Sequence, residues 1–118
     1  MRLDRYPFAM ITLPDKFATW LTCKNWALHP HQLAMLKTAD LPAQVLIAPT
    51  GAGKTLAGFL PSLIELAEQP SRGLHTLYIS PLKALAADIK RNLISPIDEL
   101  GLDVSVEDRT GDTSSHIK

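Results

Sequence analysis

The strongest indication of the fold is the stretch Val45-Leu-Ile-Ala-Pro-Thr-Gly-Ala-Gly-Lys-Thr55, in which an apolar run is followed by a glycine-rich loop and then by a predicted helix. Residues 45–48 are continuously apolar, which is typical of a short strand buried on both faces. The helix is expected to begin near Lys54, and Pro61 is expected to kink it. Its apolar stripe consists of Leu56, Phe59, Leu60, Leu63 and Ala67.

The same alternation of strands and helices continues on both sides of this stretch. Helices are expected at residues 15–24 and 30–39, and strands at residues 76–80 and 104–108. Ser80 and Pro81 predict the start of a further helix, and Ser95 to Asp98 predict a second, short one that Gly101 ends. Strands that alternate with helices indicate an α/β fold, with a parallel sheet of about three strands flanked by helices.

The loop has the spacing of a phosphate-binding loop, with four residues between Ala48 and the Gly53-Lys54-Thr55 sequence. Glycines let backbone N–H groups approach a triphosphate closely, and the following helix N-terminus favours negative charge. Lys54 would contact the β- and γ-phosphates, and the hydroxyl of Thr55 suits Mg²⁺. Ala48 stands where the general pattern has glycine. The predicted nucleotide-binding residues of the loop are Pro49, Thr50, Gly51, Ala52, Gly53, Lys54 and Thr55, of which Lys54 and Thr55 are the catalytic candidates.

Composition excludes several other classes of protein. The 118 residues include 12 basic and 12 acidic side chains, so the formal net charge is zero and a histone-like cationic coat is excluded. No apolar run has the length of a membrane span. Cys23 is the single cysteine, which excludes an internal disulfide and favours a cytoplasmic setting. His29 and His31 are two residues apart, so they should not share a helical face and a metal pair is not expected.

Four segments, in order, carry a resemblance to superfamily 2 helicases of the DExH type. Residues 48–55 resemble motif I, in which alanine in the first position is common, and Gln32 stands in the place of the Q motif. Residues 80–88 resemble motif Ia, and residues 109–113 resemble a glycine-containing nucleic-acid loop. The sequence is most similar to the large helicase-related (Lhr) group, including its ligase-associated bacterial members, and the resemblance extends from about Leu13 to Lys118.

This resemblance implies different roles for different parts of the chain. Residues 1–14 would be an N-terminal segment, and residues 15–118 the first part of a RecA-like ATP-binding domain. Gln32, whose amide offers a donor and an acceptor, would bind the adenine of ATP. The resemblance also implies single-stranded nucleic acid as a partner, DNA rather than RNA, and a role in DNA repair. The residues that would contact the nucleic acid are Pro81, Leu82, Lys83, Arg109, Thr110, Gly111 and Asp112.

Hydrolysis in the resembled family also needs an Asp-Glu-x-His-type segment and a second RecA-like lobe, and neither occurs in these 118 residues. We therefore expect an N-terminal fragment of a helicase that is inactive alone and works with the rest of the helicase chain. Two other interpretations stay open. The chain could be a different phosphate-binding-loop NTPase, indifferent to nucleic acid, or a non-catalytic module that binds nucleotide or nucleic acid.

Overall fold

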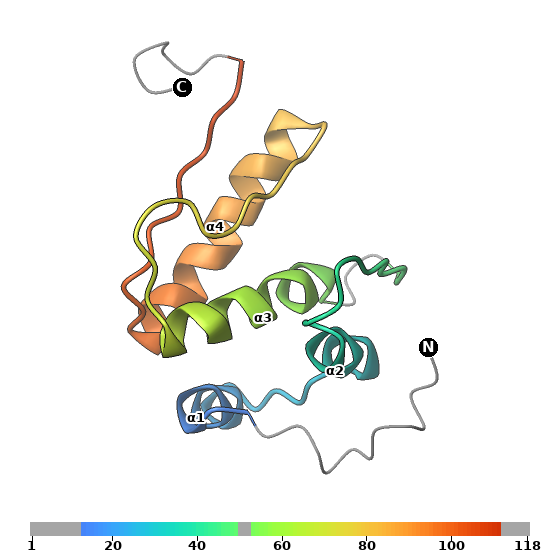
Figure 1. Cartoon of the computed structure of the whole chain (residues 1–118), viewed down its shortest axis with the longest axis vertical. Helices are drawn as coiled ribbons and strands as arrows, with labels where there is room; N and C mark the ends of the chain where they lie inside the picture. The colour runs from blue at the N-terminus through green and yellow to red at the C-terminus, as the bar shows by residue number, and fades with distance from the viewer. Residues whose placement is uncertain (1–12, 50–52, 112–118) are drawn as a thin grey trace. The chain divides into compact units, whose positions relative to one another are not determined.

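The computed structural model describes residues 13–49 and 53–111. The chain divides into two compact units, Met1–Gln69 and Pro70–Lys118. The regular structure of the described residues is helical throughout, with three helices in the first unit and one in the second (Figure 1).

The first helix of the first unit, α1 (Asp15–Cys23), follows Pro14 directly. Its buried side chains are Phe17, Trp20 and Leu21, the one-sided spacing that predicts a helix with one face toward a core. The helix ends where the Lys24 N–H donates to the Trp20 carbonyl. The predicted helix at residues 15–24 is thus confirmed to within one residue.

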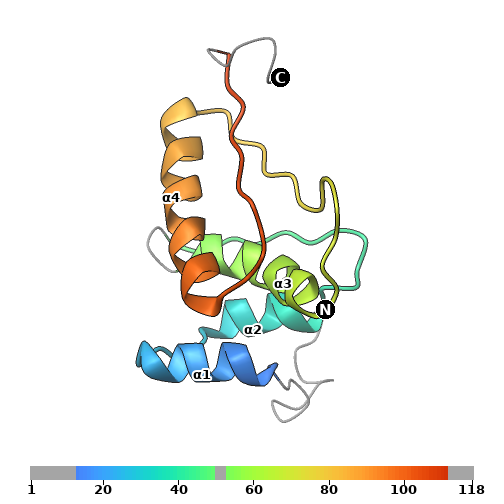
Figure 2. The same ribbon diagram turned by 90° about the vertical axis from the view of Figure 1, so that its left-hand side faces the viewer.

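Helices α2 (Pro30–Lys37) and α3 (Lys54–Glu68) pack against each other. In Figure 1, α2 lies beside the N-terminal end of α3, and in Figure 2 it lies directly below α3. Pro30 is the first residue of α2. Proline lacks a backbone N–H, but an N–H at this position would have no hydrogen-bond partner within the helix. Helix α3 begins at Lys54, as predicted, and Pro61 lies inside it. The buried residues of α3 are Ala57, Leu60 and Leu63.

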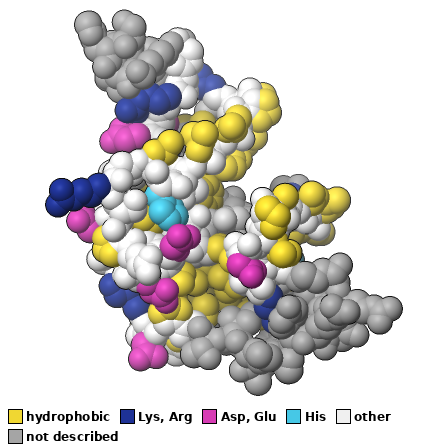
Figure 3. All heavy atoms as spheres, in the orientation of Figure 1, with side chains coloured by type: hydrophobic (Ala, Val, Ile, Leu, Met, Phe, Trp, Pro, Cys, Tyr) yellow, Lys and Arg dark blue, Asp and Glu magenta, His cyan; other side chains and the backbone are white. Residues whose placement is uncertain are grey.

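The predicted α/β fold is wrong for the described residues. Residues 45–48, 76–80 and 104–108 were expected to be strands, but none of them belongs to a strand or a sheet. The side chains of Val45 and Ile47 are 87% and 90% exposed, and that of Ile79 is 81% exposed. An apolar run shows what a segment could bury, but a strand also needs a partner that completes its backbone hydrogen bonds. Hydrophobic side chains therefore gather on the surface over residues 41–49, at the right of Figure 3.

In the second unit, one continuous helix, α4 (Lys83–Leu100), is present where two helices were predicted. It begins after Leu82, and the Ser80 hydroxyl accepts a hydrogen bond from the Leu82 N–H just outside the helix. The predicted stop and restart at residues 95–98 is wrong, because α4 continues through Pro96. The reason is the continuous stripe of buried Leu93, Ile97 and Leu100, whose burial outweighs the hydrogen bond that the proline removes.

Gly101, which was predicted to end the short helix, ends the continuous α4 instead, in the left-handed conformation with φ of 65°. Beyond it the chain is extended, and half-buried Leu102, Val104 and Val106 alternate with exposed residues. The alternation predicted for this segment is therefore present, although the segment has no strand neighbour among the described residues. Over the same described ranges, no helix combines the length and the hydrophobicity required to cross a bilayer.

Candidate nucleotide-binding site

The predicted phosphate-binding loop meets α3 at Gly53. Gly53 is the N-cap residue of α3 and adopts the left-handed conformation, with φ of 76° and ψ of 30°. Its carbonyl accepts the first helical hydrogen bond, from the Ala57 N–H at 3.0 Å. Lys54 is the first residue of the helix and is exposed, and Thr55 follows it half-buried. Three of the predicted loop residues, Thr50, Gly51 and Ala52, lie outside the described residues.

Gln32 connects the start of α2 to the start of α3. Its side chain is buried, and its Oε1 accepts a hydrogen bond from the His29 backbone N–H at 2.8 Å. Its Nε2 donates to the Gly53 carbonyl oxygen at 3.1 Å, across 21 residues of sequence. The sequence motifs placed Gln32 and Gly53 in one site, and the structure brings them into direct contact.

The contact with Gln32 also explains why position 53 requires glycine. A Cβ atom built at Gly53 would lie 2.6 Å from the Gln32 Nε2 atom and 3.8 Å from the His29 Cδ2 atom. The Gln32 amide would have to move, and it could move only by giving up its bond to the Gly53 carbonyl or its bond to His29. The positive φ adds a second reason, because an L side chain is strained in that conformation.

Two histidines beside this junction were not predicted to lie together. The rings of His29 and His31 stack, with centroids 5.5 Å apart and an interplanar angle of 7°. They were expected not to share a helical face, and they stack because His29 is the extended residue before the helix rather than part of it. Pro30 at the helix start was the signal that could have shown this. The His31 Nε2 atom is buried and has no hydrogen-bond partner within residues 13–49 and 53–111.

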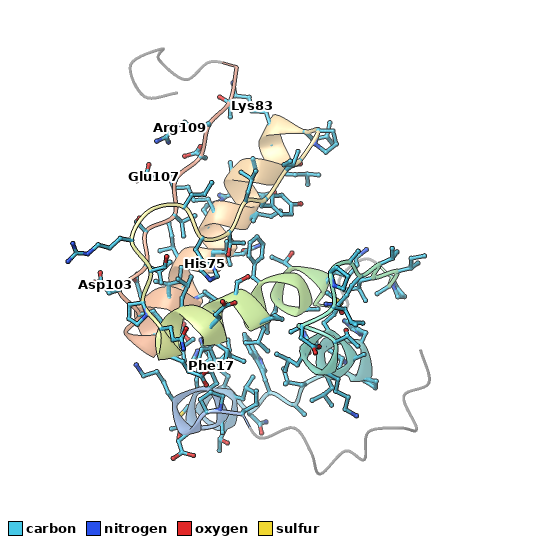
Figure 4. The ribbon with its side chains drawn as sticks, in the orientation of Figure 1. Phe17, His75, Lys83, Asp103, Glu107 and Arg109 are labelled. Carbon is cyan, nitrogen blue, oxygen red and sulfur yellow. The ribbon has the colours of Figure 1, made fainter. Side chains whose placement is uncertain are left out.

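The residues predicted to contact nucleic acid belong to the second unit. Pro81 and Leu82 are exposed and precede α4, and Lys83 is its first residue. Arg109 lies in the extended segment after α4, and Figure 4 shows it toward the same end of the unit as Lys83. Thr110 and Gly111 follow Arg109, whereas Asp112 lies outside the described residues.

An ion pair ties this extended segment to α4. The Lys90 Nζ atom lies 2.8 Å from the Asp108 Oδ1 atom, and the two side chains are 34% and 43% exposed. Their hydrogen bond, and then the attraction of the two charges, lower the pKa of Asp108 and raise the pKa of Lys90. Helical periodicity did not predict this pair, because its two residues lie 18 positions apart and in different segments.

Comparison with known proteins places the chain in a family. Residues 29–118 match the family model of the DEAD/DEAH box helicases, and the chain belongs to that family. The resemblance to the Lhr group is confirmed as well, as distant homology to Lhr-Core helicases over most of the chain. No solved structure matches it.

Among its relatives, an ATP-dependent helicase Lhr-Core of Sulfolobus acidocaldarius is 38% identical over 113 residues, which cover 86% of this chain and 13% of the relative. The protein of the same name in Saccharolobus solfataricus is 39% identical over the same shares. An Lhr helicase and probable uracil glycosylase of Mycolicibacterium smegmatis is 55% identical over 56 residues, covering 45% of this chain and 4% of the relative. The chain thus spans about one eighth of the length of its Lhr-Core relatives.

Proposed function

We propose that this chain forms part of an ATP-dependent helicase that acts on DNA in repair, and that its own task is to bind ATP with Mg²⁺. The observation that carries the proposal is the junction of α2 and α3. A left-handed glycine caps α3 directly before Lys54, and a buried glutamine from α2 holds that glycine by its carbonyl. This is the local geometry that a phosphate-binding loop needs where it enters its helix.

The phosphates of ATP would bind at the start of α3. The first N–H groups of a helix have no partner within the helix, and the helix dipole places partial positive charge there. Lys54 is exposed at this end, so its ammonium group can reach the β- and γ-phosphates without first breaking away from a core. As charge develops on the γ-phosphate during transfer, this cation would stabilise it.

The residues present also fit a magnesium ion bound together with the nucleotide. Thr55 is half-buried in the first turn of α3 and carries the hydroxyl oxygen that a hard cation accepts as a ligand. Among the described residues no three histidine, cysteine or acidic side chains gather into a metal site. Oxygen atoms of the bound nucleotide would be among the other ligands. When bound, the ion would neutralise charge on the β- and γ-phosphates.

The adenine is proposed to contact Gln32. Each polar atom of its amide has one protein partner in the structure, and each can make one further hydrogen bond. The Oε1 atom can accept from the adenine amino group, and the second hydrogen of Nε2 can be donated to a ring nitrogen. Gln32 would then contact both the bound adenine and Gly53 of the phosphate-binding loop.

The second unit is proposed to contact single-stranded DNA. Lys83 at the start of α4 and Arg109 in the extended segment provide cations toward one end of this unit (Figure 4). Backbone groups at residues 81–83 and 109–112 would provide the remaining contacts to phosphates, which are independent of base sequence.

ATP hydrolysis by the native protein that carries this segment tests the proposal. We expect hydrolysis that requires Mg²⁺ and rises several-fold on addition of single-stranded DNA, with a smaller rise for RNA of the same length. Hydrolysis that ignores both nucleic acids would show a different phosphate-binding-loop NTPase. Nucleotide binding with no hydrolysis under any condition would show a non-catalytic module.

A further inference from the structure

Asp108 occupies an unusual position among the contacts of the second unit. Its carboxylate accepts a hydrogen bond from the Lys90 ammonium group, at 2.8 Å, from the middle of α4. Its backbone carbonyl accepts a hydrogen bond from the Arg109 Nη1 atom, also at 2.8 Å. One residue therefore joins the helix to the extended segment and holds the guanidinium group of the next residue.

The neighbouring charges leave this arrangement intact. Arg91, which follows Lys90 on α4, pairs with Asp88 one helical turn earlier. The Arg109 Nη1 atom also lies 3.4 Å from the Glu107 carboxylate, so its guanidinium group is held close to the backbone of the segment at residues 107 and 108. Lys90 thus holds the extended segment on α4 through the Asp108 carboxylate, and the Asp108 carbonyl in turn holds the Arg109 guanidinium group.

We propose that the Lys90–Asp108 pair is a positioning pair that sets Arg109 for contact with a phosphate of the DNA strand. This inference rests on the proposed DNA contact of the second unit. Lys90 and Asp108 would not touch the DNA themselves. They would keep the segment after α4 along the helix, so that Arg109 meets the strand in one orientation instead of many.

The proposal predicts an effect of unusual sign. A carboxylate beside a phosphate site repels DNA, so electrostatics alone predicts that its removal tightens binding. If Asp108 positions Arg109, its removal instead weakens binding, although the protein becomes more positive. An exposed ion pair has a modest energy, and we therefore expect Asp108→Asn to weaken binding about threefold. The matched control is Asp103→Asn, which removes an exposed carboxylate from the same segment (Figure 4) and should leave binding unchanged or slightly tighter.

The salt dependence of binding separates positioning from general stability. Each phosphate contact on a single strand contributes about 0.7 to the slope of log affinity against log salt concentration. Asp108→Asn should lower that slope by about 0.7, as though a cation had been removed, because Arg109 no longer meets its phosphate. A variant that was merely less stable would keep the slope.

The experiment measures binding of a fluorescent 20-nucleotide oligothymidylate to the native protein that carries this segment, across a series of KCl concentrations. We expect weaker binding and a smaller slope for Asp108→Asn and Lys90→Met, and recovery in the charge-exchanged variant Lys90→Asp with Asp108→Lys. In an Arg109→Ala background, Asp108→Asn should have no further effect. Unchanged or tighter binding of Asp108→Asn would overturn the positioning role. Absence of oligothymidylate binding by the unmodified protein would instead overturn the proposed DNA contact and, with it, this inference.

Discussion

At the scale of single residues, the most informative position is Gly53. Three requirements meet there: a left-handed backbone, a carbonyl that accepts from Gln32, and no room for a Cβ atom. In the spacing of a phosphate-binding loop, a glycine at this position lets the backbone approach a bound phosphate closely. The structure adds a reason internal to the protein, which is the packing of α2 on α3.

Substitution of Gly53 by alanine should therefore lower both stability and nucleotide binding. We expect a loss of about 1–3 kcal/mol in the free energy of unfolding, because the strained φ and the displaced Gln32 amide act together. Gly58→Ala is the matched control in the same helix, since a Cβ there would meet nothing within 4 Å. It should stabilise the protein by about 0.5–1 kcal/mol.

Denaturant unfolding and titration with a fluorescent ATP analogue check this pair of variants. If Gly53→Ala had the same stability to denaturant and the same affinity for ATP as the unmodified protein, the contact between Gln32 and Gly53 would not support the site.

Sequence reasoning found individual residues better than it found their partners. The loop residues and Gln32 were identified because phosphate and adenine chemistry restricts the residue types at fixed spacing. The bond from Gln32 to Gly53, the stacking of His29 on His31 and the pairing of Lys90 with Asp108 were not predicted. Each depends on how separate backbone segments approach each other, which periodicity along one segment does not contain.

At the scale of elements, helices were predicted more successfully than strands. An amphipathic helix satisfies its own backbone hydrogen bonds, so the pattern at residues 15–24 or from Lys54 onward is nearly sufficient to predict it. A strand depends on a neighbour. The apolar run at residues 45–48 therefore predicted a sheet, yet Ile47 is 90% exposed and belongs to no strand in the part of the chain that the structure describes.

Helix α4 provides a test of the corrected boundary at Pro96. In a continuous helix, proline removes one backbone hydrogen bond and its ring clashes with the preceding turn. Pro96→Ala should then stabilise the protein by roughly 1–3 kcal/mol. At the first position of a separate helix, the same substitution would change stability little. A thermal melt followed by circular dichroism distinguishes the two, and an unchanged midpoint would support the break that the sequence suggested.

The pair that joins α4 to the segment after it should depend on pH only at the extremes. Because the pKa of Asp108 is lowered, its contribution is complete above its ordinary value of 3.8 and is lost as pH falls through the folded-state value. Because the pKa of Lys90 is raised, its contribution is complete below 10.5 and is lost as pH rises through the folded-state value. The pair should thus be intact between about pH 5 and 9.

A titration followed by NMR at the Asp108 carboxyl carbon checks this prediction. The midpoint should lie below 3.8 in the unmodified protein and return toward that value in Lys90→Met. Equal midpoints in the two proteins would mean that the pair does not form in solution.

At the scale of the whole molecule, the 118-residue chain exposes several large apolar side chains. Val45, Ile47 and Ile79 are each more than four fifths exposed. Unburied surface of this kind contributes nothing to cooperative unfolding and favours association. The 118-residue chain by itself should therefore unfold broadly with temperature and associate as its concentration rises.

Calorimetry and sedimentation velocity measure these two properties. Ile47→Lys should reduce association without changing the helix content, because Ile47 lies outside the helices. A sharp two-state transition of a monomer would contradict this description of the chain.

The proposed site of ATP binding is the junction of the phosphate-binding loop with α3. The most direct test is equilibrium binding of ATP with Mg²⁺ to the native protein that carries this segment, to Lys54→Ala and to Lys16→Ala. Lys16 is an exposed lysine in the first turn of α1 and serves as the matched control. We expect Lys54→Ala to lose at least tenfold in affinity and Lys16→Ala to bind like the unmodified protein. Equal affinity in all three proteins would contradict the assignment of the loop.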